Sequence, residues 1–77
     1  METDQELAMR QAAACEAAAV CAETEPDVAR VVAAARAIYP YGSVAVRLPS
    51  RLGQWGAVDM KSADGECHTD FRTRGTR

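Results

Sequence analysis

Residues 43–73 read SVAVRLPSRLGQWGAVDMKSADGECHTDFRT, and apolar and polar side chains alternate along three parts of this stretch. Such alternation is typical of β-strands that have one face on a core and the other in water. Residues 49–53 and 62–65 separate these parts and contain proline, serine, aspartate and glycine, which favour turns. We therefore predict an antiparallel meander of three strands, at residues 43–48, 54–61 and 66–73.

The same alternation predicts how the strands align. Pairing Lys61 with Glu66 across the second turn, and Leu48 with Gln54 across the first, gathers the apolar side chains on one face. That face would form the inner wall of a sheet covered by a helix. In this register the opposite face carries a row in which Trp55 lies between two arginine residues, namely Arg47 and Arg72.

Two helices are predicted before the sheet. Residues 3–6 (TDQE) form a capping-box pattern, and the alanine-rich segment after them has high helix propensity, which predicts a first helix at 4–23. Residues 24–27 (TEPD) repeat the start signal and predict a second helix at 25–38. Because the second helix has the clearer apolar stripe, we expect it to pack on the sheet. The chain of 77 residues is then one small α+β domain.

Composition limits the classes of protein to consider. Residues 1–28 hold seven acidic residues and one arginine, whereas residues 29–77 hold eight basic and four acidic residues, so the sheet is the basic part. The three cysteines are an odd number and do not suggest a disulfide framework. Residues 12–22 are apolar but are interrupted by Glu16 and preceded by acidic residues, unlike a signal peptide or a membrane span. We therefore expect a cytoplasmic protein that does not enter membranes.

No residue pattern indicates catalysis. The predicted register places Ser43, Asp59 and His68 in one row, but a hydrolytic triad needs histidine between the hydroxyl and the carboxylate, and this row has Asp59 in the middle. The glycines do not form a phosphate-binding motif, and one histidine with scattered thiols does not form a metal site. We expect no enzyme activity, cofactor or metal.

Binding is therefore the predicted role, because tryptophan and arginine contribute disproportionately to interface energies. The row around Trp55 is the proposed centre, and it could also be a cation–π stack that serves only the fold. Charged residues on the same face and in the first loop would extend the surface. The candidate partner-binding residues are Arg47, Trp55, Arg72, Arg51, Lys61, Asp59 and His68.

Two alternatives stay open from the residues alone. A nucleic-acid-binding module would use the basic residues Arg47, Arg51, Lys61 and Arg72, since aromatic and basic surfaces bind single strands. A structural subunit would form a homo-oligomer through the first helix or through the unpaired edge of the first strand.

Three segments also carry a resemblance to a known group of proteins. Residues 41–48 (YGSVAVRL), 53–55 (GQW) and 61–65 (KSADG) resemble the helix-then-meander pattern of small phage-encoded anti-CRISPR proteins, in particular inhibitors of type I surveillance complexes. This resemblance covers less than half of the chain. It implies a non-enzymatic inhibitor or adaptor that binds a multisubunit Cas complex and blocks target DNA access or nuclease recruitment. Within the matched segments, it assigns Arg47 and Trp55 to the contact surface.

Overall fold

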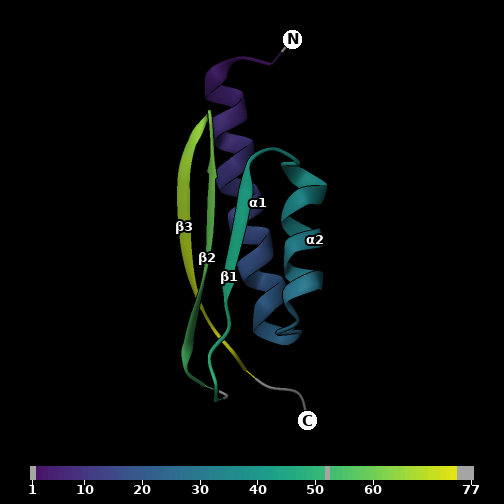
Figure 1. Cartoon of the computed structure of the whole chain (residues 1–77), viewed down its shortest axis with the longest axis vertical. Helices are drawn as coiled ribbons and strands as arrows, with labels where there is room; N and C mark the ends of the chain where they lie inside the picture. The colour runs from purple at the N-terminus through teal and green to yellow at the C-terminus, as the bar shows by residue number, and fades with distance from the viewer. Residues whose placement is uncertain (1, 52, 75–77) are drawn as a thin grey trace.

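The fold is known from a computed structural model, which describes residues 2–51 and 53–74 and has the predicted α+β architecture. The elements in chain order are α1 (Asp4–Thr24), α2 (Val28–Ile38), β1 (Ser43–Arg47), β2 (Trp55–Ser62) and β3 (Gly65–Arg72). The three strands form one antiparallel sheet in the order β1-β2-β3, and both helices lie on the same side of it (Figure 1). The second helix packs on the sheet as predicted, against β1, while α1 covers β3 and β2.

The alanine-rich α1 is the helix that lies closest to the middle of the sheet. The Thr3 hydroxyl accepts a hydrogen bond from the Glu6 N–H at 3.1 Å, which caps the first turn as predicted. On the buried side, Ala14 and Ala18 have no exposed surface. Their small side chains bring the helix so close to β2 that the Cys15 thiol donates to the carbonyl oxygen of Val58, at 3.3 Å.

The start of α2 differs from the prediction. We placed it at residue 25 with Thr24 in the capping position, but the N-cap is Asp27, whose carboxylate accepts from the N–H groups of Ala29 and Arg30. Thr24 is the last residue of α1, and its hydroxyl donates to the Cys21 carbonyl. A carboxylate at the positive end of the helix dipole is a favourable cap, which explains why Asp27 takes this role.

The β2–β3 hairpin has the predicted register, with Lys61 opposite Glu66. The pairing continues by one position to Ser62 and Gly65, so the loop is a two-residue turn rather than a four-residue one. Gly65 has a φ of 132°, which a residue with a side chain rarely adopts. The turn therefore depends on this glycine.

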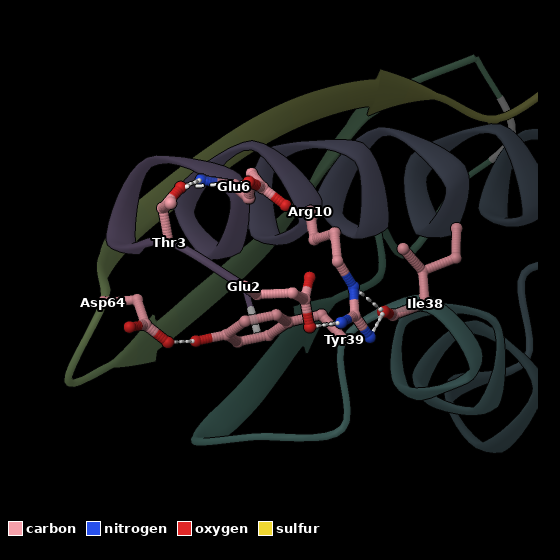
Figure 2. A network of polar contacts seen from close by, with 7 residues as sticks. All are labelled: Glu2, Thr3, Glu6, Arg10, Ile38, Tyr39 and Asp64. Carbon is pink, nitrogen blue, oxygen red and sulfur yellow. Dashed lines mark hydrogen bonds and ion pairs between the residues drawn. The ribbon is translucent and has the colours of Figure 1, made fainter.

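Two buried residues hold the tip of that hairpin. The Gln11 side chain, 2% exposed, donates to the Gly65 carbonyl at 3.0 Å. The Tyr39 hydroxyl lies 2.6 Å from the Ser62 hydroxyl. It also donates to the Asp64 carboxylate, as Figure 2 shows. Side chains from α1 and from the end of α2 thus fix the hairpin relative to both helices.

The carboxyl end of α2 is also tied to α1. The Arg10 guanidinium donates to the Ile38 carbonyl through Nε, at 3.2 Å, and through Nη2, at 2.8 Å (Figure 2). It also forms an ion pair with Glu2. Arg10 therefore satisfies a carbonyl that the end of a helix leaves without an intrahelical partner.

The β1–β2 register is offset by two residues from the predicted one. Arg47 lies opposite Ala57, and Val46 lies opposite Val58. The offset keeps every side chain on its predicted face and only replaces Val44 by Val46 opposite Val58. Gly42 contributes to this alignment, because a Cβ there would lie 2.2 Å from the Lys61 carbonyl oxygen, so only glycine lets the chain pass so close.

Candidate binding surface

The outer face of the sheet points away from the helices and carries nearly all of the predicted site residues. We divide it into two ends. The tryptophan end consists of Arg47, Trp55 and Arg72, and the carboxylate–histidine end consists of Asp59, Lys61, Glu66, His68 and Asp70. All eight side chains are exposed.

At the tryptophan end, Trp55 is the first residue of β2 and has 58% of its surface exposed. The prediction that the indole points away from the core is therefore confirmed. Arg72 lies directly opposite on β3, as predicted, and its Nε donates to the Gly53 carbonyl at 2.7 Å. This hydrogen bond holds the guanidinium group over the end of the first loop.

The predicted row of two arginines around Trp55 is wrong for Arg47. Because β1 is offset by two residues, Arg47 faces Ala57 and is only a diagonal neighbour of Trp55. Diagonal positions on a sheet are about 7–8 Å apart, which long side chains can still span. Arg51 is exposed in the loop between β1 and β2 and, like Arg47, precedes Trp55 in the sequence.

A hollow of about 640 Å³ adjoins the indole, and its lining includes Trp55, Arg72 and the side chain of Glu23 from the end of α1. The segment after β3 forms one wall, because the Arg74 N–H donates to the Glu23 carbonyl at 3.0 Å. Arg74 Nε also pairs with the Glu23 carboxylate at 3.3 Å. The sequence did not reveal this wall, since Glu23 and Arg74 are far apart in the chain and neither belongs to a motif.

At the other end, His68 lies between two carboxylates. Its Nδ1 is 2.5 Å from Asp59 and its Nε2 is 2.8 Å from Asp70. Ionised carboxylates only accept, so the imidazole must carry a proton on both nitrogens to satisfy both contacts. Hydrogen bonding to Asp59, and secondarily to Asp70, accordingly raises the pKa of His68 above 6.5. Beside this group, Lys61 and Glu66 form an ion pair at 3.5 Å.

The row that contained the three residue types of a triad does not form. Ser43 lies opposite Lys61, and the residue opposite Asp59 on β1 is Ala45. A hollow of about 420 Å³ lies at this end of the face, and its lining includes Ser43 and His68. Asp70, the second carboxylate at His68, is a contact that the sequence analysis missed, although residues two apart on a strand always share a face.

The cysteines of the chain are free thiols. Burial, together with the neighbouring Cys15 thiol, raises the pKa of Cys67 to about 12. The Cys67 thiol therefore stays protonated at neutral pH, and a protonated thiol is a poor nucleophile.

Comparisons with protein-family models, with characterised proteins and with solved structures find no match for this chain. Across residues 2–51 and 53–74, no helix has the length and apolar character needed to cross a bilayer. The same residues contain no group of three or more histidine, cysteine or carboxylate side chains arranged to hold a metal ion.

Proposed function

We propose that this chain is a small non-enzymatic protein that binds another protein through the tryptophan end of its outer face. The observation that carries this proposal is the exposed indole of Trp55, 58% accessible at the rim of a hollow that Arg72 and Arg74 also line. Tryptophan and arginine are among the residues that most often dominate the energy of a protein interface. The partner surface would offer an apolar group for the ring and carboxylates for the guanidinium groups.

The contrast between the two ends of the face supports this location. Each charged side chain of the carboxylate–histidine end faces an opposite charge within the chain, in the pairs Lys61–Glu66, Asp59–His68 and Asp70–His68. The tryptophan end instead presents a large apolar side chain to solvent. A partner therefore gains more by covering the tryptophan end, where it buries an exposed indole.

The kind of inhibitor or adaptor follows from the anti-CRISPR resemblance alone. In that reading the partner is a subunit of a type I surveillance complex, and binding blocks access to target DNA or nuclease recruitment. Arg47 and Trp55, which the resemblance assigns to the contact surface, both lie at the tryptophan end. Their side chains share the outer face, as a single contact surface requires.

Two variants test the proposal. Wild-type protein, Trp55→Ala and the control Val20→Ala are immobilised at equal density and exposed to a purified type I surveillance complex. Val20 is a matched control because it is an apolar residue on α1 with 62% of its surface exposed, away from the sheet. We expect wild type and the control to retain the complex, and Trp55→Ala to lose at least tenfold in affinity, on the order of the effect of a hot-spot residue.

Other outcomes divide the alternatives. Retention that does not depend on Trp55 would contradict the proposed surface. If the surveillance complex does not bind but a host lysate yields a protein that depends on Trp55, the surface stands and the anti-CRISPR partner is wrong. Retention of DNA that falls steeply with salt would indicate phosphate contacts and the nucleic-acid alternative.

A further inference from the structure

Within residues 2–51 and 53–74, the outer edge of β3 pairs with no other strand. β3 is the last strand in the sheet order β1-β2-β3 and has eight residues (Figure 1). Alternate residues of an antiparallel strand bond to one neighbour. The Thr73 N–H donates to the Gln54 carbonyl at 3.4 Å. The backbone N–H and C=O groups of the odd-numbered residues of β3 therefore point toward β2. The backbone groups of Glu66, His68, Asp70 and Arg72 therefore point outward.

The opposite edge of the sheet is protected in ways that the β3 edge is not. β1 has five residues and lies between Pro40 and Pro49. Short strands and prolines are among the usual means of preventing edge pairing. β3 contains no proline, and its pairing with β2 is continuous along its whole length.

The charges along β3 are arranged so that two antiparallel copies of the strand place opposite charges next to each other. The outer-face residues alternate in sign, as Glu66, His68, Asp70 and Arg72. If a second copy pairs antiparallel about a two-fold axis at Thr69, Glu66 of each chain lies opposite Arg72 of the other. In the same register His68 lies opposite Asp70, and both pairs occur twice. These residues carry the outward backbone groups, so they occupy the hydrogen-bonded positions of the new ladder.

The inner face agrees with this register. Thr69 meets Thr69 at the axis, and Cys67 meets Phe71 on either side, which are compatible neighbours on a sheet. Neighbouring registers place like charges together. An axis at His68 sets Glu66 against Asp70, and an axis at Asp70 sets that residue against itself. Among the registers centred from His68 to Asp70, the one at Thr69 alone pairs all four outer residues with opposite charges.

We propose that β3 pairs with β3 of a second copy, antiparallel and centred on Thr69, to form a homodimer with one continuous six-stranded sheet. The two-fold axis is perpendicular to this sheet, so both Trp55 side chains lie on the same outer face. The dimer does not depend on the proposed function. If both hold, the dimer presents two binding sites on one face, at opposite ends of the paired strands, and a multisubunit partner binds it with higher avidity than it binds a single chain.

A charge exchange between positions 66 and 72 tests the register. Glu66→Arg sets arginine against Arg72 in a homodimer, and Arg72→Glu sets glutamate against Glu66. In each variant two symmetric pairs change from attraction to repulsion, which weakens dimerisation on the order of thirtyfold. In an equimolar mixture of the two variants, both pairs of the heterodimer are attractive again. Arg47→Glu, on the other edge of the sheet, is the control and keeps the dimer.

Sedimentation equilibrium over a range of concentrations measures these effects directly. We expect wild type and Arg47→Glu to approach twice the chain mass of 8.3 kDa. We expect each single variant at position 66 or 72 to remain near that chain mass, and their mixture to return to the dimer. A wild type that is monomeric throughout overturns the proposal. So does a Glu66→Arg variant that still dimerises fully, or a mixture that fails to recover.

Amide hydrogen exchange supplies a second measurement that does not rely on variants. The outward amides of Glu66, His68, Asp70 and Arg72 should exchange more slowly as concentration rises. Those of Cys67, Thr69 and Phe71, which bond to β2, should be protected at every concentration. Concentration-dependent protection of β1 amides instead would place the dimer contact at the β1 edge and overturn the proposal. Because Trp55 takes no part in the edge, a failed partner-binding experiment and a failed dimer experiment are distinguishable.

Discussion

The inner and outer faces of the sheet come from the same three strands but contribute to the stability of the fold to different degrees. On the inner face, Val58, Met60 and Phe71 have at most 1% of their surface exposed and lie under the helices. On the outer face, charged side chains pair with one another, and Trp55 stays 58% exposed. The inner face therefore sets the stability of the domain, while the outer face can change without unfolding it. Each of the following experiments tests that division.

The largest effect is expected from a charge on the inner face. Val58→Asp places a carboxylate without a partner in the core, which costs about 4 kcal/mol or more. The core of a domain of this size rarely supplies more than about 3–5 kcal/mol of stability, so the variant should be unfolded at room temperature. Circular dichroism and chemical-shift dispersion would show this. Ser43→Asp introduces the same charge on the outer face opposite Lys61 and should remain folded. Equal behaviour of both variants would mean that the faces are assigned wrongly.

A smaller loss should come from filling the space at Gly56. A Cβ at this position would lie 2.4 Å from Cζ of Phe71 and 2.5 Å from the Arg47 carbonyl oxygen. Gly56→Ala should therefore lower the free energy of unfolding by about 2 kcal/mol, as overpacking does in other cores. Urea denaturation measures this change. A Phe71→Leu substitution added to Gly56→Ala should recover only part of the loss, because the contact with the carbonyl oxygen persists.

The hairpin tip offers a third test. Tyr39→Phe keeps the buried ring but removes the hydroxyl that bonds to Ser62 and Asp64. The melting temperature should fall by about 5 °C, since the hydrogen bonds of one hydroxyl group are lost from a small domain. Tyr41→Phe is the control, because Tyr41 is 51% exposed. An equal shift in both variants would show that the Tyr39 hydroxyl does not hold the hairpin.

The smallest effect is expected at the outer-face carboxylate–histidine end. The pKa of His68 is raised above 6.5, mainly by its hydrogen bond to Asp59. A raised pKa in the folded state means that His68 stabilises the protein fully below about pH 6.5, and that this contribution disappears as pH rises through the folded pKa. The melting temperature of wild type should exceed that of His68→Gln at pH 5.5, and the difference should shrink toward pH 9. A difference that grows with pH would contradict the assignment.

The accuracy of the sequence-based register depended on the length of each turn. The β2–β3 pairing could be predicted because a short turn with Gly65 leaves little freedom in alignment. The loop from β1 to β2 is longer, and sliding β1 by two residues preserves the alternation of faces. The hydrophobic pattern therefore could not distinguish the two registers. The contact between Gly42 and the Lys61 backbone, which fixes the true one, is visible only in three dimensions.

The role of α1 was harder to foresee for a different reason. Alanine has little hydrophobicity, so the buried stripe through Ala14 and Ala18 gives a weak periodic signal. These small residues let α1 approach the sheet closely, and hydropathy does not measure this effect. The same limitation applies to the binding surface. The exposure of Trp55 followed from strand alternation, whereas the wall formed by Glu23 and Arg74 required the end of α1 and the segment after β3 to be placed together.

Quenching of tryptophan fluorescence is the most direct test of the outer face as a contact surface. Trp55 is the single tryptophan in the chain, so its emission reports on this surface alone. We expect acrylamide to quench the free, folded protein strongly, and a protein partner retained by wild type but not by Trp55→Ala to protect the ring. Weak quenching of the free protein would show that the indole is covered within the fold. Unchanged quenching in the complex would place the contact elsewhere.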